Sequence, residues 1–262
     1  MVPRLAYDLQ TRRPAAGFTQ RDRALSHTAN TYGQPIGLPV SGWTPRPRPG
    51  RVTLDGRYCR LEPLGAQRHG AELYAAYATA PDGRDWTYMS VGPFEDEASY
   101  LIHAHKAEAS ADPLHYAVID RASGRATGTL ALLRIDPANG SIEVGFVAFS
   151  PALKRTPVST EAQYLLMAYV FDGLGYRRYE WKCDDLNAPS RAAAARLGFQ
   201  YEGTFRQAVV YKGRNRDTAW FAMTDRDWPS LSAAFDAWLA PDNFDADGAQ
   251  RRSLAAIRAG LD

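Results

Sequence analysis

The spacing of apolar and polar residues predicts a regular series of strands and helices from about residue 58 onward. Short alternating runs bounded by turn residues predict strands, and apolar residues three and four positions apart predict helices. The strands expected in the first half are 58–64, 114–120, 125–135 and 141–149. The helices expected there are 66–79 and 95–110. Short turns join the last three strands, which favours an antiparallel meander.

The second half of the chain begins with a segment, 160–174, that is apolar nearly all round and therefore predicts a buried helix. A strand at 177–184 follows, and then a short helix with Asn187 as its N-cap and Gly198 just past its end. Residues 201–224 predict a β-hairpin, and the tail predicts two amphipathic helices. We therefore expect an α/β fold, with one mixed sheet of about seven strands and helices on both faces.

Three regions of the chain differ in composition. Residues 1–50 are dense in proline and glycine and predict an extended arm, 51–225 form the main domain, and 226–262 form a helical extension. The arm either recruits a partner domain or packs across its own fold or a neighbouring subunit. The tail helices pack on the core or on a second subunit, which leaves a homodimer open. The apolar anchors expected in the arm are Ile36, Leu38, Val40 and Trp43.

The overall composition is that of an ordinary globular protein. Of 262 residues, 45% are hydrophobic, 23% are charged, and the formal net charge is +2. This charge argues against nucleic-acid binding, because few excess cations are available to neutralise phosphates. No apolar run is long enough to span a membrane, and the first residues lack the apolar core of a secretory signal. Two distant cysteines, Cys59 and Cys183, suit a reducing compartment, so we expect a cytoplasmic protein.

The junction at residues 150–166 is a candidate anion site. A basic loop precedes a helix expected to begin near Ser159, and a helix N-terminus binds anions through its free N–H groups and its dipole. Loops that hold phosphate usually contain glycine, whereas Pro157 stands in the middle of this one. Proline has no N–H and a fixed φ, so one backbone bond to a phosphate cannot form there.

Three motifs, together with the order of elements, carry a resemblance to a known family. They are IEVGFVAFSP, STEA at the start of the third helix, and NAPSR…RLGFQYEG after the fifth core strand. The chain resembles the GNAT superfamily of acetyl-CoA-dependent N-acetyltransferases, and within it the Rim-type ribosomal-protein N-terminal acetyltransferases. The resemblance covers about residues 58–223. It implies a GNAT-like mixed sheet in which the fourth and fifth core strands splay apart around the pantetheine arm of acetyl-CoA.

The resemblance also implies that the loop before the third helix wraps the pyrophosphate of acetyl-CoA. Where the family has Gln or Arg, then Gly, then a small residue, this chain has Lys154, Pro157 and Ser159. The loop keeps its length and loses its glycines, which leaves open how it binds the cofactor. Charged side chains can replace backbone contacts, since charge-assisted hydrogen bonds are about twice as strong as neutral ones. The cofactor-binding residues expected here are Lys154, Arg155, Thr156, Val158, Ser159 and Thr160.

Acetyl transfer to an amine needs a neutral nucleophile, donors for the developing oxyanion, and a proton for the departing thiolate. By the resemblance, the main-chain N–H groups of Val147, Ala148 and Phe149 supply the oxyanion donors, near a bulge that the family has. Glu143 is the only charged residue in its apolar strand and is the leading candidate for the base. A structural ion pair with an arginine of the neighbouring strand, such as Arg134, explains it equally well.

The short helix after the fifth core strand supplies two further candidates. In the family the asparagine at Asn187 contacts the pantetheine arm or a catalytic water, and the same residue can also cap the helix. Ser190 is a candidate donor of the thiolate proton, with a water molecule as the alternative. Many relatives use a tyrosine as this acid, but Ala194 occupies its place here, so the general acid is not assigned.

The acceptor pocket is expected between the first two helices and their connecting loop. Trp86, Tyr88 and Met89 are apolar enough to line it, and Asp85 could attract an ammonium, although core packing or loop ordering also explains each of them. His103 and His105 are two residues apart on a helix and face different directions, so no metal site is expected.

The resemblance and the motifs together support one function and leave one alternative. We expect a transferase that moves an acetyl group from acetyl-CoA, as co-substrate and without a metal, to the primary amine of a protein N-terminus or a small molecule. The alternative is a non-catalytic acyl-CoA-binding or regulatory module on the same fold, suggested by Pro157 and Ala194. Nothing in the sequence identifies the acceptor amine.

Overall fold

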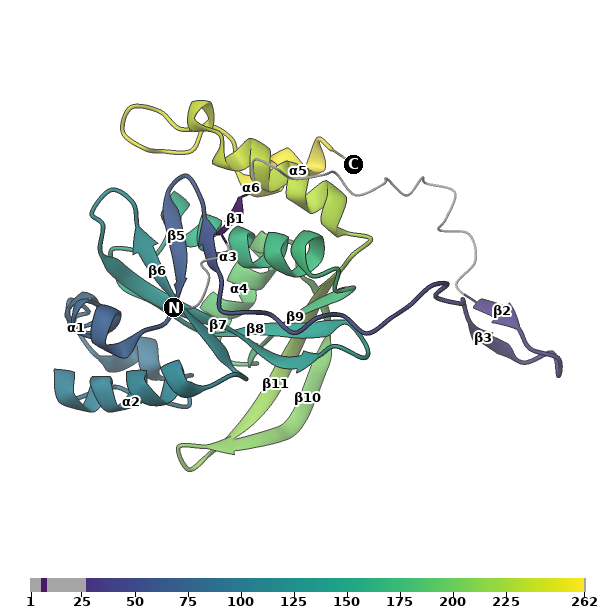
Figure 1. Cartoon of the computed structure of the whole chain (residues 1–262), viewed down its shortest axis with the longest axis horizontal. Helices are drawn as coiled ribbons and strands as arrows, with labels where there is room; N and C mark the ends of the chain where they lie inside the picture. Colours follow the sequence, from purple (N-terminus) through teal and green to yellow (C-terminus); the bar gives the residue numbers. More distant parts are fainter. Residues whose placement is uncertain (1–5, 9–26, 262) are drawn as a thin grey trace.

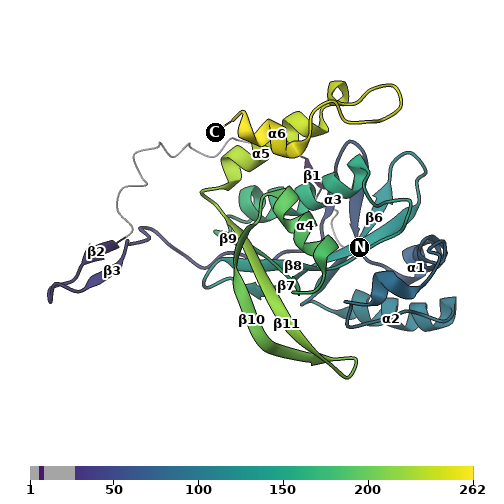
Figure 2. The same ribbon diagram turned by 180° about the vertical axis from the view of Figure 1, so that it is seen from behind.

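The computed structural model describes residues 6–8 and 27–261 of the chain. These residues form a nine-stranded mixed sheet with helices on both faces (Figures 1 and 2). Its strand order is β1-β4-β5-β6-β7-β8-β9-β11-β10. The strands are β1 (Ala6–Asp8), β4 (Thr53–Asp55), β5 (Cys59–Pro63), β6 (Leu114–Asp120), β7 (Ala126–Asp136), β8 (Ser141–Phe149), β9 (Arg178–Asp184), β10 (Gln200–Tyr211) and β11 (Arg214–Thr224). The expected α/β fold is confirmed, with two strands more than predicted.

The helices divide between the two faces of the sheet. On one face, α1 (Ala66–Tyr77) and α2 (Glu97–Ala109) cover a small apolar cluster that includes Leu73 and Tyr100. On the other face lie α3 (Pro157–Ala168), a π-helical turn η4 (Tyr169–Gly173) and α4 (Ala188–Leu197). The short 3-10 helix η3 (Gly83–Trp86) lies in the loop between α1 and α2.

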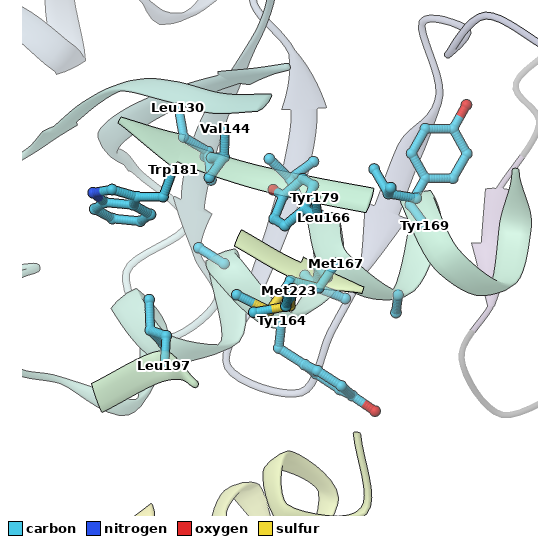
Figure 3. Packing of buried hydrophobic residues seen from close by; sticks show 14 of the residues in the cluster. Leu130, Val144, Tyr164, Leu166, Met167, Tyr169, Tyr179, Trp181, Leu197 and Met223 are labelled. Carbon is cyan, nitrogen blue, oxygen red and sulfur yellow. The ribbon is translucent and has the colours of Figure 1, made fainter. Parts of the chain in front are cut away.

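The larger core lies between the sheet and α3, and it explains why α3 is apolar all round. From Thr160 to Ala168 every residue of α3 is buried. Leu166 and Met167 pack with sheet residues such as Val144, while Tyr164 points away from the sheet (Figure 3). Helix α3 is therefore covered on two sides.

The C-terminal helix α5 (Trp228–Leu239) provides the second cover of α3, and α6 (Leu254–Ala259) packs on α5 and α4 (Figure 1). Tyr164 of α3 stacks on Phe235 with 5.3 Å between ring centroids, and the indole N–H of Trp228 donates to Asp172 at 2.8 Å. The short 3-10 helix η5 (Pro241–Asn243) follows α5. Of the two packing modes left open for the tail, the structure shows packing on the protein's own core.

The start of α3 differs from the prediction. The helix begins at Pro157, three residues before the predicted residue 160, and Thr156 is its N-cap. The Thr156 hydroxyl accepts from the Ser159 N–H at 3.3 Å, as in a standard cap. Proline is favoured at the first helical position because its missing N–H would lack an intrahelical partner there anyway. Pro157 is therefore the first residue of α3 and does not lie inside the loop between β8 and α3.

The described part of the arm has three sections, of which β1 pairs with β4 at one edge of the main sheet. Strands β2 (His27–Ala29) and β3 (Pro35–Gly37) form a separate exposed hairpin that projects away from the domain (Figure 1). Residues 43–50 instead run along the domain, where the Trp43 indole donates to the Ala138 carbonyl at 2.9 Å. The expected anchors Ile36, Leu38 and Val40 are exposed, so these three do not anchor the arm to its own fold, and packing on a neighbouring subunit stays a prediction. The rest of the predicted arm, 1–5 and 9–26, lies outside the described residues.

Candidate active site

Strands β8 and β9 are paired along only half their length. They run parallel, as a crossover through α3 requires, and pair from Ser141–Arg178 to Val144–Trp181. Beyond Val144 no ladder pair joins the two strands in the described structure. The separation of the fourth and fifth core strands that the resemblance implied is therefore present.

A bulge lies in β8 directly beyond the point of separation. Ala131 of β7 pairs with Gly145 and Thr129 pairs with Ala148, so one residue of β7 faces Phe146 and Val147 together. Phe146 has a φ of 49°, in the left-handed region that residues other than glycine rarely adopt. A bulge leaves its extra residue outside the ladder and directs backbone groups away from it. This segment can therefore present N–H groups to a ligand between the strands.

A hollow of about 80 Å³, partly open to solvent, follows the bulged end of β8. It is lined by Tyr77, Asp85, Trp86, Val147, Ala148, Phe149, Ser150, Pro151 and Lys154. Ser150 is 1% exposed, and its hydroxyl has no hydrogen-bond partner in the structure. A buried hydroxyl without a partner is costly, so the hollow suits a ligand with a polar group at this point.

The basic loop between β8 and α3 lies at one end of this hollow. Lys154 and Arg155 are exposed, and Arg155 has a φ of 61°. Lys154 forms an ion pair with Asp85 at 2.5 Å. Lys154 was expected to bind the cofactor and Asp85 to attract the acceptor amine, but the structure pairs the two with each other.

The remaining candidates at the start of α3 are already engaged in bonds within the protein. The Thr156 hydroxyl donates to the Leu153 carbonyl at 2.7 Å and accepts from the Ser159 N–H. Thr160 is buried inside the helix, where its hydroxyl accepts from Arg196 at 3.1 Å. An α-helix leaves only its first N–H groups free, so Val158 keeps the most available one.

Glu143 lies in a buried network of charges on the sheet face that carries α1 and α2. It accepts from Arg134 at 2.6 Å and from the Lys182 ammonium at 2.9 Å. Lys182 also contacts Glu180 at 2.7 Å and lies over the Trp220 ring, 3.6 Å from its centroid. The structure therefore contains the Arg134 pairing that was left open as an alternative, together with a second cation that was not expected.

Asn187 and Ser190 lie where the sequence places them, at the start of α4. The Asn187 side chain accepts from the Ser190 N–H at 3.1 Å, which confirms the predicted cap. The Ser190 hydroxyl accepts at 3.0 Å from the indole N–H of Trp181, which is the last residue of β9 that pairs with β8. Ala194 is fully buried and offers no acid.

The loop between α1 and α2 closes the site on the other side. Trp86 and Met89 line a second, nearly closed pocket beside the bulge, together with Leu64, Tyr77, Val91, Tyr100, His103, His115, Thr129, Phe146 and Ala148. Burial lowers the pKa of His115 to about 4, so its imidazole is neutral at neutral pH. Tyr88 lines neither pocket, because its hydroxyl reaches the Leu186 carbonyl at 3.2 Å.

Sequence reasoning missed three residues that shape this site. The Tyr77 hydroxyl donates to the carbonyl of Ala148, next to the bulge, at 3.1 Å. The ammonium of Lys212, at the tip of the β10–β11 hairpin, donates to the carbonyls of Trp86 and Gly92. Ser150 is the third. Only Ser150 had a signal in the sequence, because it ends the strand at the candidate anion loop.

Two searches of the described residues complete the description. Within 6–8 and 27–261, no group of three or more His, Cys, Asp or Glu side chains could hold a metal ion. None of the helices in the same ranges is long and apolar enough to cross a membrane.

Comparison with known proteins gives matches over most of the chain. The family model for the acetyltransferase (GNAT) domain matches residues 60–200. The crystal structure of a GCN5-related N-acetyltransferase from Brucella melitensis is 53% identical, with a TM-score of 0.83, and covers 84% of this chain and 100% of that one.

Two curated relatives are more distant. The "Uncharacterized N-acetyltransferase p20" of Bacillus licheniformis is 28% identical over 146 residues, which are 54% of this chain and 80% of that protein. The "Putative ribosomal N-acetyltransferase YdaF" of Bacillus subtilis is 27% identical over 105 residues, which are 40% of this chain and 57% of that protein.

Proposed function

This chain belongs to the GNAT acetyltransferase family, and from that premise we propose that it moves the acetyl group of acetyl-CoA to the primary amine of a protein N-terminus or a small molecule. The observation that carries the proposal is the parting of β8 and β9 beyond Val144, with the bulge at Phe146 beside the opening. This arrangement leaves backbone groups of β8 unpaired within the fold, next to a hollow that ends at a basic loop.

The residues of the hollow and the loop fit acetyl-CoA. The unpartnered Ser150 hydroxyl suits a polar group of the pantetheine arm, and Lys154 and Arg155 suit its phosphates. The Val158 N–H at the start of α3 adds a backbone donor, and Asn187 remains a candidate on the β9 side. When bound, acetyl-CoA supplies an activated acetyl thioester.

The protein's own groups would then orient the reactants and stabilise charge. We assign the stabilisation of negative charge on the attacked carbonyl oxygen to backbone N–H groups of Val147, Ala148 and Phe149, because fixed donors of this kind usually make the largest catalytic contribution. The Tyr77 hydroxyl holds the Ala148 carbonyl and so helps to fix the bulge. Ser190 stays the candidate donor of the thiolate proton, although its hydroxyl is already bonded to Trp181.

We propose that Glu143 positions Lys182 and does not accept the substrate's proton. Both cations compete with that proton for the carboxylate, and an N-terminal amine is partly neutral at pH 7 without a base, because its pKa is about 7.7–8.0. Substrate deprotonation would then occur in solution or through water.

Glu143→Gln separates the two roles of this carboxylate. As a positioning residue, Glu143→Gln is expected to lower the free energy of unfolding, by about 1–3 kcal/mol for a disturbed buried bond to a charge, and to leave the shape of the profile of kcat/KM against pH unchanged. The measurements are urea unfolding and initial rates between pH 6 and pH 9. Loss of the acid limb of the profile, with normal stability, would make Glu143 the base.

The function itself is tested by release of free thiol from acetyl-CoA. The purified protein is incubated with acetyl-CoA and a panel of amines: peptides with free N-termini, polyamines and amino acids. Amine-dependent, saturable thiol release is expected. Saturable binding of acetyl-CoA with no turnover on any amine would support the binding module, and absence of binding would refute both. A cytoplasmic location and a homodimer stay predictions.

A further inference from the structure

The β10–β11 hairpin carries an unusual density of positive charge. Between Gly203 and Arg216 it has four cations, Arg206, Lys212, Arg214 and Arg216, and no acidic residue. None of the four forms an ion pair with a carboxylate within the described part of the chain, where the neighbouring Arg178 and Arg191 both do. These four cations therefore form no close ion pair, although Asp217, the next residue of β11, lies near enough to Arg206 for the two charges to interact.

The tip of this hairpin contacts the loop between α1 and α2, on the side of the site where the acceptor pocket is expected. Lys212 donates to the carbonyls of Trp86 at 2.8 Å and Gly92 at 2.7 Å, and Arg214 donates to the Thr87 carbonyl at 2.8 Å. Burial and repulsion from Arg214 lower the pKa of Lys212, which is consistent with an uncompensated positive field. The same loop contributes Trp86 to the pocket beside the bulge.

Arg216 connects the tip with the opening between the strands. Side chains of a strand alternate between faces, so Arg216, Thr218 and Trp220 share one face of β11. The Arg216 guanidinium donates to the Thr218 hydroxyl at 3.1 Å, and Thr218 pairs with Asp184 at the end of the separated part of β9. Trp220 lies under Lys182 on the same face.

Two of the four cations have an evident structural task and two do not. Lys212 and Arg214 hold the loop between α1 and α2 through hydrogen bonds. Arg206 and Arg216 make no hydrogen bond to that loop within the described residues. Lys182, deeper on the same face, is neutralised by Glu143 and Glu180. Arg216 is thus available to a ligand on the face of β11 that leads to the opening.

We propose that the acceptor is an amine that carries an anionic group, a carboxylate or a phosphate, and that Arg216 recognises this group. The inference rests on the proposed function and specifies its substrate class. Arginine binds both anions with paired hydrogen bonds, and a surface of one sign attracts ligands of the other sign from a distance. Such an acceptor would place its amine at the bulge and its anion at the hairpin.

The test compares matched acceptors. One pair is Ser-Glu-Glu and Ser-Gln-Gln peptides with free N-termini and amidated C-termini, and the other is phosphoethanolamine and ethanolamine. For at least one pair, kcat/KM is expected to be about tenfold higher for the anionic member, and 0.5 M NaCl should reduce this ratio. The pair that shows the effect identifies carboxylate or phosphate as the recognised group.

The variant R216Q should move that ratio toward one. The control R226Q removes one exposed cation away from the hairpin tip, changes the net charge equally, and should leave the ratio as in the wild type. Equal rates within both pairs, or equal effects of the two variants, would refute the inference while leaving the proposed function intact. Failure to acetylate any amine would refute the proposed function, and this inference with it.

Discussion

Lys182→Met is expected to lower the free energy of unfolding by about 3–5 kcal/mol, because it removes the cation shared by two buried carboxylates. The side chain of Lys182 is 5% exposed, that of Glu143 is 4% exposed, and Lys182 lies 2.9 Å from Glu143 and 2.7 Å from Glu180. Arg134 and Arg178 would remain, but each reaches only one of the two acids.

The pH dependence gives a second measure of the same network. Burial alone would raise the pKa of Glu180, but hydrogen bonds and attraction from Lys182 and Arg178 outweigh it and lower the pKa below its ordinary value of 4.5. A lowered carboxyl pKa stabilises the folded protein above that ordinary value, and this stability is lost as the pH falls through the folded-state pKa. The difference between wild type and Lys182→Met should therefore shrink below about pH 4.5.

Urea unfolding at several pH values measures both effects. Lys154→Met is the matched control, because Lys154 pairs with Asp85 at the surface, where such pairs contribute about 0–1 kcal/mol. The double variant Glu143→Gln, Lys182→Met should recover part of the loss, since one unpaired carboxylate is removed. Similar destabilisation by Lys154→Met and Lys182→Met would contradict the account of a buried network.

Arg155→Ala is expected to weaken acetyl-CoA binding by about 1.5–3 kcal/mol, the usual contribution of a hydrogen bond to a charged group, which corresponds to roughly 10- to 150-fold in Kd. Lys154→Ala should cost less, because Lys154 must leave Asp85 before it can reach a phosphate. Asp85→Asn removes that competitor and should tighten binding severalfold. Calorimetry with acetyl-CoA measures all three.

Arg155→Gly is the matched control that separates charge from backbone conformation. Arg155 has a φ of 61°, and a left-handed conformation costs a residue with a β-carbon about 1–2 kcal/mol that glycine avoids. The glycine variant should therefore bind acetyl-CoA as weakly as Arg155→Ala does, and it should unfold at a higher urea concentration than Arg155→Ala. Wild-type affinity in both variants would show that side-chain charge does not compensate for the missing glycines.

Local features of the fold could be predicted because their signals lie within a few residues. Asn187 before a short helix and Gly198 after it predicted both ends of α4, and Gly198 indeed has a φ of 101°. The start of α3 was misplaced although its signal was equally local. Threonine followed by proline is a strong helix start, but the expectation of a glycine loop made Pro157 look like an interruption.

The parts of the site that depend on distant contacts could not be predicted. The bulge at Phe146 depends on how Ala131 and Thr129 of the neighbouring strand pair with β8. The contact between Lys212 and the loop that joins α1 to α2 links residues 120 or more positions apart. For Glu143, the residue type allowed a base or an ion pair, and its contact with Lys182 forms between two neighbouring strands whose pairing no local signal reveals.

The way the C-terminal helices cover α3 has a consequence for how the protein unfolds. The GNAT family model ends at residue 200, yet Trp228, Phe235 and Trp238 belong to the same buried cluster as the strands beside the opening. Side chains of α3 pack on the sheet on one side and on α5 on the other. Loss of either contact therefore exposes buried apolar side chains of α3. The segment after residue 225 is thus an integral part of one cooperative unit, and a chain shortened there would expose a large aromatic surface and tend to aggregate.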